Sequence, residues 1–295
     1  MTRNARAARA GLLFAAPALL VITTFFFLPV VAGFALSLTD FDIYAIASAH
    51  NLRWAGLENY ARLSRDPLFW TALRNTLYFV LVGGPLSVLV SLAAALALNV
   101  RWLPGRAAFR TVLFLPVVTT LVAVAVGWRY LYHPRIGLIG QMVRAVGLQP
   151  IDWLGDPVWA MPAIILLAVW KNFGFNMLIF LAGLQSIPDE LYEAAQLDGA
   201  RAWQQFSHVT VPGLTPVLLL VGLTTLIGYL QLFGEPYVMT GGGPGNATLS
   251  LMLYTFREGF RWWNMGYAAA IAFLMFSLLL AITLLARRWR GSDLG

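Results

Sequence analysis

Residues 157–188 read PVWAMPAIILLAVWKNFGFNMLIFLAGLQSIP, a run of 32 residues with a single charge, Lys171. An α-helix of about 20 apolar residues is long enough to cross a hydrocarbon core about 30 Å thick. Helices of water-soluble proteins normally carry charged residues on one face and seldom run this far without them. Residues 157–188 therefore predict a transmembrane helix.

Five further stretches contain no charged residue, and each is long enough to form a transmembrane helix. They are Ala10–Thr39, Asn75–Val100, Thr111–Trp128, Ala202–Gly234 and Trp262–Ala286. Composition agrees, because 59% of the residues are hydrophobic and only 11% are charged, against about a quarter in a soluble domain. We therefore predict an all-α membrane protein that forms a single domain over residues 1–295. Its six transmembrane helices are expected at approximately 11–38, 75–100, 109–131, 159–184, 212–234 and 264–287.

The first span has a second interpretation, because Arg3, Arg6 and Arg9 before an apolar run also describe a signal peptide. The apolar core of a signal peptide is about 7–15 residues long. The uncharged stretch here has 30 residues, so we expect a retained transmembrane helix.

The arginines predict the orientation of the spans. Nine of them lie in the long loops near 40–74, 129–156 and 235–261. Ten lie in fewer than 60 residues, in the shorter segments 1–10, 101–110, 185–213 and 287–295. Because cytoplasmic loops are enriched in Lys and Arg, we expect both termini and the segment between spans four and five to be cytoplasmic.

Motifs of catalysis and of cofactor binding are missing from the sequence. There is no cysteine, and the glycine-rich run Gly241–Gly245 lacks the lysine of a nucleotide-binding loop. His50, His133 and His208 lie in three different loops, which gives no metal-ligand spacing. The arginines punctuate apolar runs instead of forming one basic stripe, which argues against nucleic acid as a partner. We expect no enzyme activity, cofactor or metal ion on this chain.

The predicted cytoplasmic segment 185–212 is long and reads as two short helices. Ser186, with Asp189 three positions later, is typical of a capping box that starts the first helix. Gly199 is placed to adopt a left-handed turn that ends it. A second helix is expected at about 201–209, before the fifth span.

Residues of the first short helix favour contact with another protein. Leu191, Ala194 and Ala195 fall on one helical face, and the small alanines allow close approach. Glu193, on a neighbouring face, offers a charge to a basic groove. The alternative is an amphipathic helix that lies on the lipid surface and merely connects two spans.

The same segment resembles the EAA loop of ABC-importer permeases. The resemblance is carried by Glu193-Ala194-Ala195, by Gly199 and by Val209-x-Val211-Pro212. The string from Ile187 to Ala200 is similar to the carbohydrate-uptake branch, the maltose and glycerol-phosphate type, of these binding-protein-dependent inner-membrane components. Strings similar to that branch also occur at 72–76, 109–116, 152–154, 239–244 and 266–270.

This resemblance implies a multi-pass permease of the bacterial cytoplasmic (inner) membrane that imports a sugar, in the di- or oligosaccharide or glycerol phosphate class. It implies pairing with a second, similar permease, two cytoplasmic ABC ATPase subunits and an extracytoplasmic solute-binding protein. ATP hydrolysis would take place in the partner subunits. The contacts that couple this chain to the ATPase would be Glu193, Ala194, Ala195, Asp198 and Gly199.

The fourth span carries the polar residues that we expect to meet the substrate. A charge at the bilayer centre costs about 2.5–3.5 kcal/mol on insertion scales, so Lys171 should face a cavity or a partner. Amides and aromatic rings together suit the hydroxyls and the apolar faces of sugars. We predict a translocation path lined by Lys171, Asn172, Phe175, Asn176, Tyr229 and Gln231. Alternatively, these groups bridge to neighbouring helices or to the companion subunit.

Two other classes of protein remain open at this stage. An ATP-independent secondary carrier or channel would more often show internal repeats or several acidic residues within its spans. A membrane scaffold would have no need for so specific a cytoplasmic loop. Residues 83–85 (Gly-Gly-Pro) and the prolines at 116, 212 and 216 are candidate bend sites for a moving permease, or ordinary helix irregularities.

Overall fold

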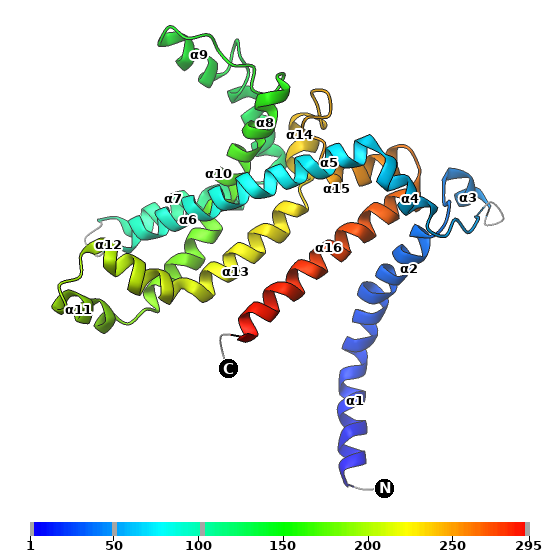
Figure 1. The fold of residues 1–295 in the computed structure, drawn as a ribbon, viewed down its shortest axis with the longest axis horizontal. Coiled ribbons are helices and arrows are strands. Elements are labelled where there is room, and N and C mark those ends of the chain that lie inside the picture. Colours follow the sequence, from blue (N-terminus) through cyan, green and yellow to red (C-terminus); the bar gives the residue numbers. More distant parts are fainter. Residues whose placement is uncertain (1–2, 49–51, 101–103, 293–295) are drawn as a thin grey trace. The chain divides into compact units, whose positions relative to one another are not determined.

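The computed structural model of the chain describes residues 3–48, 52–100 and 104–292 (Figure 1). These residues are helical, apart from loops and one isolated β-bridge between Thr39 and Trp54. The chain, predicted to be one domain, falls into two compact units, which are described separately. The first comprises Met1–Asp66 and Thr255–Ile282, and the second comprises Pro67–Tyr254 and Thr283–Gly295.

The first unit is built from the N-terminal helices and most of the last helix. Its elements are α1 (Arg3–Ile22), the π-helical turn η1 (Thr23–Phe27), α2 (Leu28–Ser37), α3 (Ile43–Ala47), α4 (Glu58–Arg65), the π-helical turn η5 (Arg257–Arg261) and α16 (Met265–Ser292), which continues past the unit. Helix α1 begins at an N-terminal arginine and therefore extends beyond the predicted span at 11–38. Arg101 and the side chains of the terminal arginines used for the orientation lie outside the described residues.

Hydrogen bonds hold α4 against α2 and α16. The Asn59 amide nitrogen donates to the carbonyl oxygens of Ser37 and Thr39, at 2.9 and 2.8 Å. The Tyr267 hydroxyl donates to the Asp66 carboxylate at 2.6 Å, and the Arg62 guanidinium lies 4.1 Å from the centre of the Tyr267 ring. The bonds from Asn59 satisfy carbonyl groups that are left free where α2 ends.

The second unit contains the other helices. They are α5 (Pro67–Tyr78), η3 (Phe79–Gly83), α6 (Gly84–Asn99), α7 (Arg106–Val118), α8 (Leu121–Leu131), α9 (Leu138–Ala145), α10 (Pro157–Gln185), α11 (Asp189–Leu197), α12 (Ala202–Gln205), η4 (Phe206–Thr210), α13 (Val211–Leu230), α14 (Gly234–Met239) and α15 (Leu251–Phe256), whose end belongs to the first unit. Helix α10 is the innermost, because 56% of its most apolar window is buried, against 39% in the helix 67–99 and 17% in the helix 202–230. Its buried side chains, Met177, Phe180 and Leu181 among them, pack with α6 and α13.

Five helices among the described residues are long and apolar enough to cross a membrane. They are Gly11–Ser37, Pro67–Asn99, Pro157–Gln185, Ala202–Leu230 and Met265–Ala286. The region predicted as the third span, 109–131, instead consists of α7 and α8, which meet at an angle of 97°. The described part of the chain thus has five helices that could each cross a membrane, or six if this bent pair is one span.

The break between α7 and α8 lies at Thr119–Thr120, three residues after Pro116. The carbonyl oxygen of Pro116 accepts hydrogen bonds from both the backbone nitrogen and the hydroxyl of Thr119, at 3.3 and 2.6 Å. Thr119 and Thr120 are then extended, and a new helix begins at Leu121. Pro116, a candidate bend site in the sequence, thus lies within α7, and the chain bends after it.

Three other prolines are accommodated by widening the preceding helical turn. The π-helical turns η1, η3 and η4 begin six residues before Pro29, Pro85 and Pro212, respectively. A proline ring collides with the carbonyl group four residues earlier in an α-helix, and a π turn displaces that group. Because the helix continues through η4, the fifth spanning helix begins at Ala202 and ends at Leu230, whereas the sequence predicted a span at 212–234 preceded by a separate short helix.

Candidate functional site

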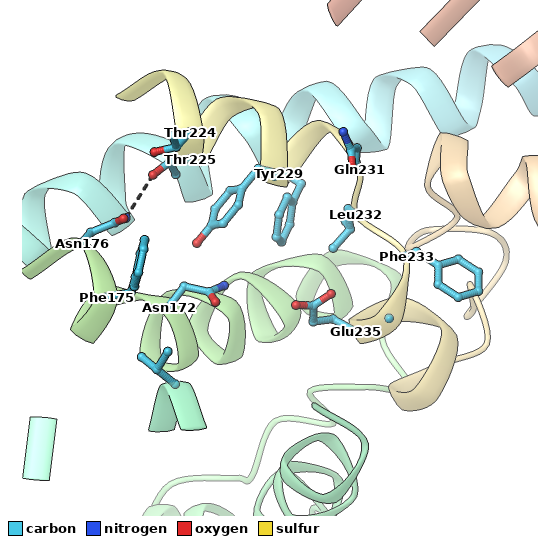
Figure 2. Close-up of a pocket in the computed structure, with 14 residues that line it drawn as sticks. Asn172, Phe175, Asn176, Thr224, Thr225, Tyr229, Gln231, Leu232, Phe233 and Glu235 are labelled. Atoms are coloured by element: carbon cyan, nitrogen blue, oxygen red, sulfur yellow. Dashed lines mark hydrogen bonds between the residues drawn. The ribbon is translucent and has the colours of Figure 1, made fainter. Parts of the chain in front are cut away.

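A cavity of about 370 Å³ lies between α10 and α13 in the second unit (Figure 2). This volume falls within the range of about 300–1,000 Å³ that is usual for small-molecule sites. The lining residues are Phe79, Val117, Asn172, Phe175, Asn176, Thr224, Thr225, Gly228, Tyr229, Gln231, Leu232, Phe233, Gly234 and Glu235. They come from α10, α13, the turn after α13, the start of α14, and single residues of η3 and α7.

Five of the six residues predicted to meet the substrate line this cavity. They are Asn172, Phe175, Asn176, Tyr229 and Gln231. Asn172 and Asn176 are one turn apart on α10, so their amides face the same space. Lys171, the sixth, is half-buried beside Asn172 and is not among the lining residues.

Asn176 also holds α10 to α13. Its amide nitrogen donates to the hydroxyl of Thr225 at 3.0 Å, and only 6% of its surface is exposed (Figure 2). The predicted bridge between neighbouring helices is therefore present at this residue, which lines the cavity as well. In a bilayer, an amide that is bonded in this way avoids the cost of an unsatisfied polar group.

The Tyr229 side chain closes one wall of the cavity. Its ring lies 4.8 Å from the ring of Phe79, centre to centre, and it also packs on Gly83, where a Cβ atom would approach Tyr229 to 3.2 Å. Its hydroxyl faces Ser87 and Asn172. Among the described residues, neither the Tyr229 hydroxyl nor that of Ser87 has a hydrogen-bond partner of acceptable geometry, although both are buried.

Glu235 was not identified from the sequence. It is the first acidic residue after the uncharged stretch Ala202–Gly234, and that position at the end of a span is the signal that could have found it. Figure 2 shows its carboxylate directed toward the space between Tyr229 and Asn172. Burial raises the pKa of the Glu235 carboxyl, and its own backbone N–H and the charge of Lys171 act in the opposite direction.

The predicted coupling segment forms an exposed surface beyond the ends of α10 and α13. Glu193, Ala194, Asp198 and Gly199 are exposed, and Ala195 is half-buried. Large apolar side chains that the sequence analysis did not single out are exposed beside them, namely Leu197 (89%) and Trp203 (72%). Apolar groups exposed in this way, together with charged ones, are typical of a surface that binds another protein.

The capping box predicted at Ser186 is wrong. Ser186 follows Gln185, the last residue of α10, and its hydroxyl donates to the carbonyl oxygen of Gly183 at 2.7 Å. Helix α11 begins after Pro188 without a side-chain cap. The prediction of a left-handed end is confirmed, because Gly199 has a φ angle of 76° and terminates α11.

Packing fixes the coupling segment to the two helices that line the cavity. Ile187 is buried in the core between α10 and α13, directly over Gly213, and the Tyr192 hydroxyl lies 3.0 Å from the hydroxyl of Thr210. The residues of α13 that line the cavity lie near its other end, which leads into α14; Figure 1 shows the course of these two helices. A helix of the length of α13 spans about 30 Å, so the arrangement connects two distant sites through continuous helices.

No group of three His, Asp or Glu side chains that could hold a metal ion occurs within residues 3–48, 52–100 and 104–292. The cavity offers neutral hydrogen-bonding groups, aromatic rings and one carboxyl group. Such a lining can bind a polar, hydroxyl-rich molecule without covalent chemistry.

Residues 87–290 match the family model described as binding-protein-dependent transport system inner membrane component. The chain is 37% identical over 280 residues to the lactose transport system permease protein LacF of Rhizobium radiobacter, covering 93% of this chain and 92% of LacF. It is 37% identical to the trehalose/maltose transport system permease protein MalF of Thermococcus litoralis, covering 95% and 92% of the two chains. Among solved structures, a chain of a bacterial alginate ABC transporter in complex with an alginate pentasaccharide-bound periplasmic protein superimposes with a TM-score of 0.79 at 25% identity, covering 96% and 94%.

Proposed function

This chain belongs to the family of binding-protein-dependent transport system inner membrane components, and we propose that it carries a sugar through the membrane as the permease subunit of an ATP-driven importer. It is a multi-pass inner-membrane protein. The chain itself has no catalytic role in this proposal and needs no cofactor, because ATP is hydrolysed by partner subunits.

The observation that carries the proposal is the cavity between α10 and α13. Amides and hydroxyls beside aromatic rings suit a saccharide, which presents hydroxyls at its rim and C–H groups on its faces. The relatives named above belong to transport systems for lactose and for trehalose and maltose, and the structural relative is in complex with a periplasmic protein that holds an alginate pentasaccharide. A di- or oligosaccharide is therefore the proposed substrate class.

Coupling to ATP would run through α11 and α12. In this proposal Glu193, Ala194, Ala195, Asp198 and Gly199 dock on an ATPase subunit, and Leu197 and Trp203 add apolar contact area. Because α10 and α13 join this surface to the cavity, a displacement of α11 would be transmitted to the cavity lining as a movement of packed helices. Lys171, Asn172, Phe175, Asn176, Tyr229 and Gln231 remain the proposed residues of the path.

The complete importer would contain this chain, a second permease, two ATPase subunits and a solute-binding protein. In this assembly the chain crosses the membrane six times, with α7 and α8 together making one crossing, and both termini are cytoplasmic. No residue in the most apolar window of the first spanning helix is buried, which fits lipid or a companion subunit as its surroundings.

The test is to express this chain with the products of neighbouring genes, purify the complex in mild detergent and measure ATP hydrolysis. We expect a complex that contains a second permease and ATPase subunits, and whose ATP hydrolysis is stimulated by the loaded binding protein. Reconstituted into vesicles, it should accumulate the sugar only in the presence of ATP. A stable, solitary protein that transports sugar without ATP would instead establish a secondary carrier or channel.

A further inference from the structure

The lining of the cavity between α10 and α13 carries an acidic residue and no basic one. Glu235 is the only charged residue of its lining, and the other polar groups are the neutral side chains Asn172, Asn176, Thr224, Thr225, Tyr229 and Gln231. No lysine or arginine is among the lining residues, all of which belong to the described part of the chain.

One cation, Lys171, acts on Glu235 from outside the cavity lining. A solute inside the cavity therefore lies beside Glu235 and beside no cationic lining residue. When Glu235 is ionised, a second negative charge close to it is strongly disfavoured at the low effective dielectric of such a site.

Contacts between α14 and α8 hold Glu235 in place. Gly234, the residue before it, packs so closely on Leu121 of α8 that an added Cβ atom would overlap that side chain. Further along α14, the Val238 carbonyl oxygen accepts a hydrogen bond from the Arg129 guanidinium at 3.4 Å. The Glu235 side chain therefore projects from a helix that is held to α8.

This arrangement favours the binding of a neutral sugar and disfavours the binding of an anionic one. Sugar hydroxyls donate hydrogen bonds to a carboxylate, and bonds to charged groups are the stronger ones. An ionised phosphate or uronate group donates none to it, and it would leave both negative charges without a facing cation. The relatives named above do not decide between the two classes, because lactose is neutral and alginate is an acidic polysaccharide.

We infer that Glu235 makes this permease selective for neutral, hydroxyl-rich solutes over anionic sugars such as sugar phosphates and uronic acids. The inference rests on the proposed function, since it assigns a charge preference to the same cavity.

The test compares the affinities of matched neutral and anionic sugars for the membrane complex of permeases and ATPases in lipid nanodiscs. The binding protein is left out, because its own specificity would obscure the result. The paired probes are trehalose with trehalose 6-phosphate, and lactose with lactobionate. Their binding is measured at equilibrium by ligand-observed NMR. We expect each anionic member to bind at least about tenfold more weakly than its neutral partner.

Two variants of the cavity lining test this ratio of affinities. Glu235→Gln removes the charge at nearly constant volume and should reduce the ratio at least about fivefold, while neutral sugars still bind. Gln231→Lys adds a cation to the lining and should also reduce the ratio, which keeps the test available if Glu235→Gln fails to assemble. Glu58→Gln, an acid-to-amide change at an exposed position of α4, should leave the ratio unchanged.

Equal binding of both members of a pair, or a ratio that neither cavity variant changes, would overturn the charge selection and leave the sugar path intact. If an assembled, ATP-hydrolysing complex binds neither member, the charge selection and the proposed sugar path are both wrong.

Discussion

At the scale of single residues, a polar side chain of the cavity can line the cavity, bond to a neighbouring helix, or do both. The sequence does not distinguish these roles. Asn176 lines the cavity and donates to Thr225, whereas Asn172 lines the cavity beside a tyrosine hydroxyl that has no hydrogen-bond partner among the described residues. A buried hydroxyl without a partner carries a desolvation cost. In the proposed path, a sugar hydroxyl that bonds to Tyr229 would remove that cost.

Replacing Asn176 with Leu should lower ATP-driven sugar uptake by about tenfold while the complex still assembles and keeps its resting ATP hydrolysis. The reason is that leucine removes the amide from the cavity together with the bond to Thr225. Thr225→Val is the matched control, because it removes the same interhelical bond and leaves the amide in place. Uptake in vesicles is the measurement; equal losses in both variants would mean that Asn176 serves only to join the helices.

Reversing the charge at Glu193 should uncouple the importer. Glu193 is exposed on α11, and a lysine there would repel a basic groove on the ATPase. We expect Glu193→Lys to reduce uptake by at least about tenfold and to weaken co-purification of the ATPase, with thermal stability unchanged. Glu58→Lys reverses a charge at another exposed position and should transport normally. Normal transport by Glu193→Lys would contradict the docking role.

At the scale of helices, glycine and proline determine how the spans pack. Gly174 of α10 lies against the backbone of α7 at Leu113, and Gly183 of the same helix lies against Leu214 and Val217 of α13. Small residues at these points let helix backbones approach closely, as is usual where no hydrophobic effect drives helix association in lipid. The prolines act on single helices by widening or breaking a turn.

An alanine at Gly174 should therefore separate α10 from α7. Its Cβ atom would overlap the carbonyl oxygen of Leu113, so we expect a loss of about 1–3 kcal/mol in stability and reduced uptake. Gly222→Ala on α13 is the control, because no atom lies within 4 Å of the added Cβ there, and alanine favours the helix. Thermal unfolding in detergent should show a lower midpoint for Gly174→Ala alone; equal midpoints would mean that this contact does not limit packing.

At the scale of the whole molecule, the bent pair α7–α8 determines the topology. If the pair crosses the membrane, the loops near Glu58 and Leu148 lie on one side, and α11 lies on the other. If it does not cross, Glu58 and Leu148 lie on opposite sides. The number of spans can therefore be determined by measuring on which side of the membrane Glu58 and Leu148 lie.

The absence of cysteine from the sequence makes this measurement simple. Single cysteines at Glu58, Leu148 and Ala194 replace exposed side chains and should be tolerated. With a membrane-impermeant maleimide on intact spheroplasts, we expect labelling at positions 58 and 148, and labelling at 194 only in inside-out vesicles. Labelling of 58 and 148 from opposite sides would rule out the six-span topology, and labelling of 194 from outside would reverse the orientation.

Some of the motifs that carry the family resemblance prove to be structural contacts. Asn75 donates to the carbonyl oxygens of Asn246 and Leu249, at 2.8 and 3.0 Å, and the Thr76 hydroxyl accepts from the backbone nitrogen of Leu251 at 2.9 Å. These bonds join residues more than 170 positions apart. The sequence showed which residues matched, and only the structure showed what they contact.

The amino-acid sequence alone was enough to show that this is a membrane protein and where its apolar helices lie. The reason is that uncharged runs of 18 to 33 residues are rare outside a lipid bilayer. The sequence also placed five residues of the cavity, since amides on one face of an apolar helix must find polar surroundings. The bend at Thr119–Thr120, the helix running unbroken from Ala202 and the approach of Glu235 to the cavity became visible only in the folded chain. They depend on contacts between distant segments and on backbone geometry at single turns. A pattern of local hydrophobicity records how deep a residue lies in the membrane, but not which helix it faces.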